Sequence, residues 1–383
     1  MASLSRWAKG LMRRAPSSPL PFPAAGFEII NDADVVEEEQ FGAFRAGQYY
    51  PVNIGDVYAS KCQITGKLGF GTTSTVWLAR NLEEHLHVAL KIYTRDRGGR
   101  EEFKTYGHLS QANPSHPGYR HVRSALDTFS LHRTGGDHRC LVQKPMWDSW
   151  RDLLRRNPAQ RFSLPLLKAG LRHVLLALDY LHNECQLVHT DIKADNILQE
   201  IVEGRLLEDF VKAELTTPSP REFIEGHPVY RSRQFGLPTQ FGGAVLSDFG
   251  TAVRGDQKRN HDAQPNVYRS PEVMLRAEWS YPVDIWNVGV MIWDLFEGKH
   301  LFYGPPPPDF VQRGNRSAEF FTADGGWKAD VPISPNITLE SSEEYLQGRD
   351  KEELLAFVRS MLRWRPEDGK TAKQLLDDPW LDS

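Results

Sequence analysis

The spacing of apolar and polar positions divides the chain into a strand-rich part and a helical part. Between Tyr50 and Tyr93, short apolar runs alternate with turn residues, which is typical of β-strands. After Trp147 the apolar residues recur with a period close to 3.6, which is typical of amphipathic helices. Strands are predicted at 63–68, 75–79, 87–92 and 140–142. Helices are predicted at 101–109, 164–182, 284–296, 351–362 and 371–376. This order indicates an α+β fold with a small β-rich lobe followed by a larger helical lobe.

Composition excludes several classes of protein. Apolar residues make up 40% of the chain and charged residues 25%, as in globular proteins. The net charge of −4 argues against direct binding of nucleic acid. The spacing of Cys62, Cys140 and Cys185 suggests neither disulfides nor a zinc site, which is typical of the reducing cytosol or nucleus. No apolar run approaches the roughly 20 residues that span a bilayer, so no membrane segment is predicted.

The N-terminal region differs from the rest of the chain. Its first 25 residues contain four basic residues and no acid. This pattern fits a mitochondrial transit peptide or a disordered basic tail, and the tail is the favoured interpretation. The acidic run Glu37–Glu39 that follows is interpreted as a solvated linker. Residues 1–47 are therefore expected to form a disordered tail.

A glycine-rich segment joins the first two predicted strands. It reads Leu-Gly-Phe-Gly-Thr-Thr-Ser-Thr-Val from Leu68 to Val76. Glycines allow backbone N–H groups to approach phosphate oxygens because no Cβ intervenes. Alone, a segment of this kind is more often a plain hairpin turn.

A lysine ends the apolar run Val88-Ala89-Leu90-Lys91 in the next predicted strand. Burial of an unpaired ammonium group is costly, so Lys91 needs an acidic partner unless it lies on an exposed strand edge. Glu102 in the predicted helix 101–109 is the expected partner, with Glu101 as the second choice.

Three polar segments follow in the helical part. They read Leu-Val-His-Thr-Asp-Ile-Lys-Ala-Asp-Asn-Ile-Leu at 187–198, Leu-Ser-Asp-Phe-Gly at 246–250, and Tyr-Arg-Ser-Pro-Glu at 268–272, followed by Asp284. Each has a plain alternative explanation: a polar loop, a chance tripeptide, or an acid favoured by a helix N-terminus. Together with the glycine-rich segment and the lysine, in this order, they cannot be explained by coincidence.

These five segments resemble the eukaryotic protein kinases. The resemblance implies a bilobal fold with an N-lobe at 48–146, a C-lobe at 147–383 and an insert at about 199–243. It also implies an ATP-dependent serine/threonine kinase that binds ATP in a cleft, with a hinge near 143–146, and uses Mg²⁺.

The resemblance assigns roles residue by residue. Asp191 would orient the attacking hydroxyl group, and Lys193 would neutralise charge on the transferred phosphoryl group. Asn196 and Asp248 would bind the metal. Phe249 would pack under the helix at 101–109. Residues assigned to the nucleotide are Leu68, Gly69, Gly71, Ser74, Val76, Ala89, Lys91, Glu102, Met146 and Leu198.

Three features resemble the SR-protein kinases in particular. The segment Tyr-Tyr-Pro-Val-Asn-Ile-Gly-Asp at 49–56 precedes the domain, and Thr190 replaces an arginine common in kinases. An insert also separates Asn196 from Asp248, which lies 52 positions later (248 − 196). The resemblance runs from about 48 to 381. It implies a monomer that phosphorylates serines in basic, arginine–serine-rich segments of splicing factors and so regulates mRNA splicing, without direct nucleic-acid contact.

The substituted arginine has a predicted consequence. In kinases that arginine binds a phosphorylated activation loop, so Thr190 predicts activity that does not depend on phosphorylation of this loop. The insert, 199–243, is interpreted as a partly ordered surface loop.

Two departures from the family pattern favour an alternative function. Family members have a helix after a segment like Leu301-Phe302, but here Gly304 is followed by four prolines and no helical period is found between 303 and 340. Gly369 also stands where kinases carry an arginine that pairs with the glutamate at the position of Glu272, unless Arg365 or Lys370 substitutes. A pseudokinase or nucleotide-binding scaffold is therefore the alternative to an active kinase. A small-molecule phosphotransferase is a third possibility, disfavoured by the segment that ends at Glu272.

Overall fold

The computed structural model describes residues 15–31, 35–95, 99–301, 314–322, 326, 328 and 338–383. The chain forms two compact units. Unit 1 comprises Met1–Phe103, Ser124–Trp147 and Ile201–Phe241, and unit 2 comprises Lys104–Arg123, Asp148–Glu200 and Gly242–Ser383. Helix α3 (Arg100–Leu109) and strand β7 (Met146–Ser149) lie where the chain passes between the units.

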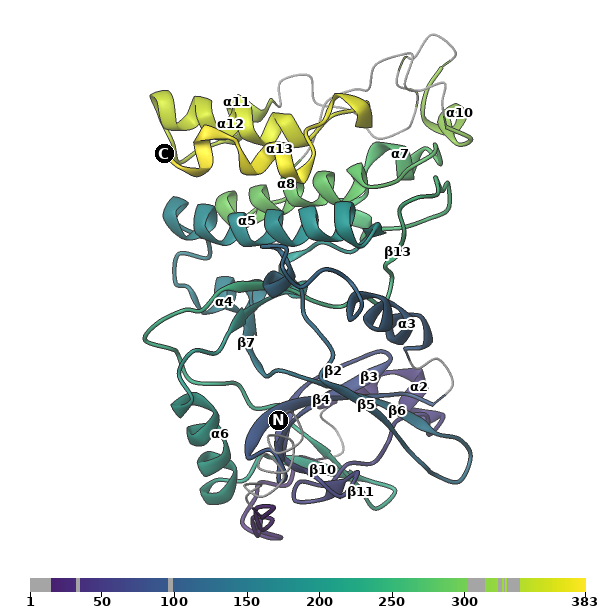
Figure 1. Cartoon of the computed structure of the whole chain (residues 1–383), viewed down its shortest axis with the longest axis vertical. Helices are drawn as coiled ribbons and strands as arrows, with labels where there is room; N and C mark the ends of the chain where they lie inside the picture. Colours follow the sequence, from purple (N-terminus) through teal and green to yellow (C-terminus); the bar gives the residue numbers. More distant parts are fainter. Residues whose placement is uncertain are drawn as a thin grey trace, which may run out of the picture. The chain divides into compact units, whose positions relative to one another are not determined.

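Unit 1 is built on a six-stranded sheet with the order β1-β2-β3-β4-β6-β5 (Figure 1). Its strands are β1 (Val57–Tyr58), β2 (Cys62–Gly71), β3 (Ser74–Asn81), β4 (Leu86–Tyr93), β5 (Asp127–Leu131) and β6 (His138–Gln143). Every neighbouring pair is antiparallel. The strands predicted at 63–68, 75–79, 87–92 and 140–142 are confirmed.

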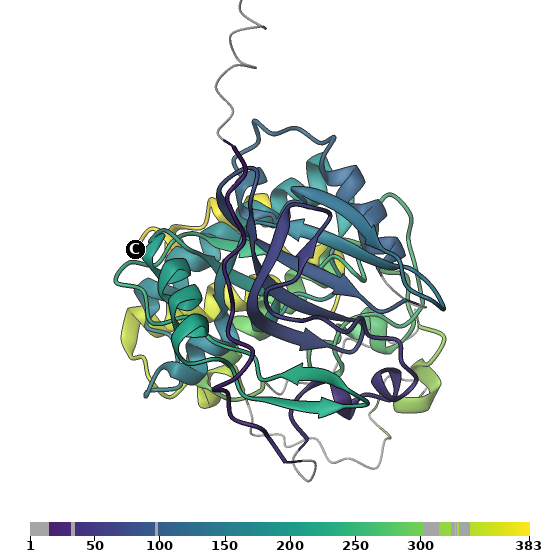
Figure 2. The same cartoon turned by 90° about the horizontal axis from the view of Figure 1, so that it is seen from below.

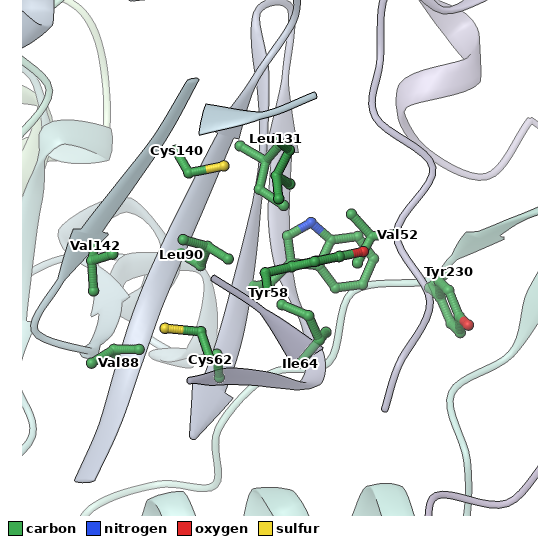
Figure 3. Close-up of a cluster of buried hydrophobic side chains, with 13 residues drawn as sticks. Val52, Tyr58, Cys62, Ile64, Val88, Leu90, Leu131, Cys140, Val142 and Tyr230 are labelled. Carbon is green, nitrogen blue, oxygen red and sulfur yellow. The ribbon is translucent and has the colours of Figure 1, made fainter. Parts of the chain in front are cut away.

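One face of this sheet carries the hydrophobic core of unit 1. Trp77, Val88 and Leu90 lie on it with residues of β2 and β6 (Figure 3). Tyr230, more than 130 residues from most of these strands along the chain, joins the same cluster and meets Trp77 edge-to-face at 5.7 Å. The core of unit 1 thus includes part of the insert.

The insert is ordered, in contrast to the surface loop that was expected. It contains helix α6 (Arg205–Thr216) and the hairpin of β10 (Arg221–Ile224) and β11 (His227–Tyr230). Phe210 of α6 packs so close to β2 that a Cβ at Gly66 would lie 2.6 Å from its ring. The interpretation of the insert as a partly ordered loop is therefore wrong, because its apolar residues are buried against the sheet.

The acidic run Glu37–Glu39 is buried rather than solvated. Lys67 of β2, itself inaccessible to solvent, forms ion pairs with Glu37 at 2.6 Å and with Glu38, and donates to the Tyr230 carbonyl at 2.8 Å. Glu37 also accepts from the backbone N–H of Ser232. The solvated-linker interpretation is wrong because a buried lysine distant in sequence supplies the missing charge.

The described part of the preceding segment also lies against unit 1. The Ser17 N–H donates to the Leu82 carbonyl, and Ile29 forms a parallel bridge with Arg221 of the insert hairpin. Figure 2 shows this segment running beside the hairpin. Helix α2 (Gly42–Arg45) follows it. The N-terminal segment and the insert together extend unit 1.

Substitution of Lys67 by methionine is expected to lower the free energy of unfolding by about 3–5 kcal/mol, because two buried carboxylates lose their cation. Lys61→Met is the matched control. It removes a solvent-exposed pair with Asp127 in the same unit and is expected to cost about 1 kcal/mol or less. Chemical denaturation of both variants measures the difference, and equal costs would show that the buried cluster adds no stability.

Unit 2 is mainly helical. Helices α5 (Leu164–Asp179) and α8 (Pro282–Glu297) pack together, with α12 (Gly348–Met361) against α8 and α13 (Ala372–Leu376) against α5 (Figure 1). These elements confirm the helices predicted at 164–182, 284–296, 351–362 and 371–376, although α5 ends at Asp179 and continues as a π-type turn. The short helices are α4 (Trp150–Arg156), α7 (Pro271–Met274), α10 (Ser317–Phe320) and α11 (Leu339–Ser342).

Two small sheets, one of three strands and one of two, position the loops of unit 2. Strand β9 (Ile197–Glu200) pairs with β12 (Ala244–Leu246), and β8 (Leu187–Val188) pairs with β13 (Val253–Arg254). The predicted loss of a helix between 303 and 340 falls mostly outside the described residues. No helix in the described part of the chain is long and apolar enough to cross a membrane.

Candidate active site

Lys91 of β4 forms the predicted ion pair with Glu102 of α3. Its Nζ lies 3.0 Å from both carboxylate oxygens of Glu102, which confirms the expected pairing. Tyr93 lies two positions along the same strand and donates its hydroxyl group to Glu102 at 2.6 Å. Tyr93 was not among the residues predicted from the sequence, although its spacing from Lys91 places both side chains on one face. Glu102 is thus held by two strand residues.

The strand pairing places other predicted nucleotide residues near Lys91. Val76 is paired with Lys91, and Ala89 precedes it by two positions, so all three occupy one sheet face. Trp77 and Leu90 are paired on the opposite face, within the hydrophobic core. The two faces of β3 and β4 therefore separate a packed core from the predicted nucleotide residues.

The glycine-rich segment forms the end of the β2–β3 hairpin, where Gly71 is paired with Ser74. A Cβ at Gly69 or Gly71 would meet nothing within 4 Å, so protein packing does not require glycine at either position. Both glycines also lack a positive φ. What the glycines provide is a bare backbone, to which a phosphate group can come close.

The catalytic-loop residues meet at Asp191 in unit 2. Lys193 Nζ lies 2.8 Å from Asp191 Oδ2, and Asn196 Nδ2 donates to the same oxygen at 2.8 Å. Asn196 Nδ2 also donates to the Asp191 backbone carbonyl at 2.8 Å. The loop therefore brings together the three side chains that the sequence predicted to act in one reaction.

A histidine and an aspartate fix the backbone of this loop. Asp284 of α8, inaccessible to solvent, accepts from the N–H groups of His189 and Thr190 at 2.8 Å each. His182 contributes a third bond at 2.9 Å, which the sequence analysis did not foresee. Asp284 therefore braces the catalytic loop through its backbone.

Thr190 replaces the usual arginine and bonds within the loop. Its hydroxyl group donates to the Thr251 carbonyl at 3.0 Å, which ties the catalytic loop to the segment after Asp248. Its φ of +68° is unusual for a β-branched residue, and the two bonds to Asp284 maintain it. At the position where kinases commonly carry a phosphate-binding arginine, this chain thus has a threonine that bonds to Thr251 without any phosphate group.

Phosphatase treatment of the purified protein is expected to change its phosphotransfer rate by less than about twofold, because Thr190 offers no positive charge to a phosphorylated activation loop. Untreated and treated protein are compared with the same acceptor, and mass spectrometry confirms that phosphate has been removed. A large loss of rate after treatment would contradict this prediction.

Asp248 and Phe249 stand at the start of the activation segment. Phe249 is fully buried and meets Tyr106 of α3 edge-to-face at 5.5 Å and His189 at 5.1 Å, which confirms its predicted packing against this helix. Asp248 is exposed and adopts a φ of +66°. Burial of Phe249 anchors the segment Asp248-Phe249-Gly250, while Asp248 itself lies on the surface of unit 2.

The oxygens of Asn196 and Asp248 suit a magnesium ion. Mg²⁺ is usually held by one or two protein carboxylates together with substrate phosphates and water. The described residues contain no cluster of three His, Cys, Asp or Glu that would form an all-protein metal site. The amide nitrogen of Asn196 is committed to Asp191, which fixes the orientation of its oxygen.

A cavity of about 540 Å³ opens beside the catalytic loop within unit 2. Asp191 and Lys193 line it together with Gln264, Arg269 and Trp279 of the activation segment and its surroundings. Gln264, which the sequence analysis missed, accepts from the Ser270 N–H and donates to the Val283 carbonyl. The segment ending at Glu272 is thereby held in a shape that leaves open space beside Asp191.

Comparison with known proteins agrees with this geometry. The protein kinase domain model matches residues 62–234 and 239–381. A serine/threonine protein kinase of Aspergillus fumigatus is 40% identical, with 96% of both chains covered. The mouse SRSF protein kinase 3 is 32% identical, covering 96% of this chain and 94% of that protein. A serine/threonine-protein kinase SRPK of Physarum polycephalum is 27% identical, covering 92% of this chain and 93% of that protein.

A solved kinase-domain crystal structure shares the fold with a TM-score of 0.66 at 19% identity, covering 87% of this chain. The chain belongs to the protein kinase family. Within it, the enzyme is a serine/threonine protein kinase, which uses ATP and acts on protein substrates.

Proposed function

We propose that this kinase phosphorylates serine residues in arginine–serine-rich protein segments. The observation that carries the proposal is the nearly end-to-end similarity to two proteins named as SR-type kinases, across more than nine-tenths of all three chains. The ordered insert and the Thr190–Thr251 bond are further support, because both lie at features that resemble that family.

In the proposed reaction, Asp191 accepts a hydrogen bond from the serine hydroxyl group and orients its oxygen toward the γ-phosphate of ATP. Lys193 neutralises charge on the transferred phosphoryl group. Bound Mg²⁺ supplies charge neutralisation at the phosphates.

Asn196 and Asp248 would hold this magnesium ion. Lys91, oriented by Glu102, would bind the α- and β-phosphates, and the bare backbone at Gly69 and Gly71 would cover them. Leu68, Ser74, Val76, Ala89, Met146 and Leu198 complete the proposed nucleotide site. We also propose a cytoplasmic or nuclear location, for which three free, buried cysteines are suitable.

A matched pair of peptides tests the substrate class. One contains arginine–serine repeats, and the other has each arginine replaced by lysine, which keeps the charge but removes the planar guanidinium group. We expect kcat/KM to favour the arginine peptide by about tenfold, and phosphate to appear on serine. Equal rates, or a preference for an acidic peptide, would overturn the substrate proposal while leaving the kinase class intact.

A further inference from the structure

A second cavity in unit 2 shares no lining residue with the cavity beside Asp191. Its volume is about 300 Å³, at the lower end of small-molecule sites. Glu272 of α7 and Trp286 of α8 line it from one side, and Arg363, Gly369 and Lys370 line it from the other. Arg363 is solvent-exposed, as are lining residues 183, 367 and 371, so the cavity opens to water along this edge.

Glu272 provides a buried acid in this cavity. Only 2% of its surface is exposed, and its Oε2 has no hydrogen-bond partner among the described residues. Burial raises the pKa of Glu272 to about 7, and the nearby Glu367 adds to the rise. Hydrogen bonds from its own backbone and from the Ser270 side chain lower this pKa but do not offset the effect of burial. A buried carboxylate with one unpartnered oxygen is costly once it is ionised, so this position favours a ligand that donates hydrogen bonds and carries positive charge.

The backbone conformation at Gly369, which lines the same cavity as Glu272, does not require a glycine. Gly369 has φ −82° and ψ 149°, which any residue can adopt. A Cβ there would have the Pro366 carbonyl oxygen as its nearest neighbour, at 3.3 Å, so a small shift of the loop would accommodate a side chain. Gly369 thus lines the cavity without a side chain of its own, and a side chain can be introduced at this position.

The basic residues that line the cavity do not neutralise Glu272. Lys370 Nζ is paired with Asp378 at 2.7 Å, and His182 bonds to Asp284. Arg363 is exposed at the mouth. Besides Glu272, the acid that lines the cavity is Glu367. Among the described residues, no basic side chain at the cavity therefore bonds to Oε2 of Glu272.

We propose that this cavity binds an alkylguanidinium group, either from an arginine side chain of a bound polypeptide or from a free guanidino compound. A guanidinium group fits better than an ammonium group for two reasons. Its planar fork donates two parallel hydrogen bonds to one carboxylate, and its weak hydration lowers the cost of burial. Two aromatic residues, Tyr281 and Trp286, are among those that line the cavity, and aromatic side chains suit a planar cation. This site is independent of the substrate proposal.

Thermal unfolding of the full chain tests the site with ethylguanidinium chloride as the probe. At pH about 8, where Glu272 is ionised, we expect a saturable rise in Tm of about 2 °C or more at roughly ten times Kd. Ethylurea, a neutral planar analogue, and sodium chloride at equal ionic strength are expected to give no such rise. At pH about 5.5, below the pKa of Glu272, the rise should disappear because the carboxyl group is protonated.

Variants of both sides of the cavity complete the test. Gly369→Arg should unfold at a higher temperature without the probe and should not respond to it, whereas Gly369→Ala should keep the response. Glu272→Gln should lose it, and Arg363→Ala should keep it. A response of equal size in all variants, no saturable response at the higher pH, or a response that appears only in Arg363→Ala would overturn the proposal.

A peptide with a single arginine distinguishes the two sources of the ligand. A glycine-flanked arginine peptide that binds more tightly than ethylguanidinium at the same site, with the same dependence on Gly369→Arg, indicates a polypeptide ligand. Equal or weaker binding of the peptide indicates a free guanidino compound.

Discussion

Replacement of Asp191 by asparagine is expected to lower kcat for phosphotransfer by about 10²- to 10⁴-fold, with little change in the free energy of unfolding. The carboxylate is the acceptor at which Lys193 and Asn196 converge, and asparagine presents only one neutral oxygen there. Steady-state kinetics with a serine peptide measure the effect.

Asp195→Asn is the matched control for this prediction. Asp195 lies in the same loop, but 46% of its side chain is exposed and its contact is a 3.5 Å pair with Arg151. Its substitution is expected to change kcat by less than about twofold, because exposed ion pairs contribute little. Activity of Asp191→Asn within tenfold of the wild type would remove Asp191 from the proposed role.

Replacement of Asp284 by alanine is expected to lower the free energy of unfolding by about 3–5 kcal/mol and to reduce activity as well. Its carboxylate accepts three buried hydrogen bonds, two of them from the backbone of the catalytic loop. Their loss leaves buried donors unsatisfied and releases the strained φ of Thr190. Denaturant unfolding and kinetics are measured on the same preparation.

The control for Asp284 is an exposed acid near the N-terminus of another helix. Asp350 lies in the first turn of α12 and is exposed, so Asp350→Ala is expected to cost about 0.3–1 kcal/mol. A similar small cost for Asp284→Ala would show that Asp284 too is merely a favourable N-terminal acid.

The elements with regular apolar periods could be predicted from the sequence, and those stabilised by distant contacts could not. Strands β3 and β4 and helices α5 and α8 each carry a run or period of apolar residues that marks them as buried elements in the local sequence. Helix α6 and the β10–β11 hairpin depend instead on contacts such as Phe210 against Gly66 and Tyr230 against Trp77. Such contacts join residues far apart in sequence, which a local pattern does not indicate.

The same distinction explains the error at Glu37–Glu39. A run of acids ordinarily indicates exposure to water, because burial of several carboxylates is costly. Here Lys67 and the Ser232 N–H compensate for that cost, and neither is adjacent in the sequence. The interpretation of an acidic run depends on a partner that only the folded chain reveals.

For the active site, the motif residues could be predicted but their supports could not. Asp191, Lys193 and Asn196 are close in sequence, and the geometry that unites them is local. Tyr93, His182 and Gln264 lie outside the recognised segments and hold Glu102, Asp284 and Ser270 respectively. The roles of the site residues toward ATP and Mg²⁺ remain predictions.

Transfer of labelled phosphate from ATP to a serine-containing peptide by the purified full-length protein tests the central claim most directly. The account predicts Mg²⁺-dependent labelling of serine that Asp191→Asn loses. Absence of labelling in a folded protein that still binds ATP would contradict the account and favour a nucleotide-binding scaffold.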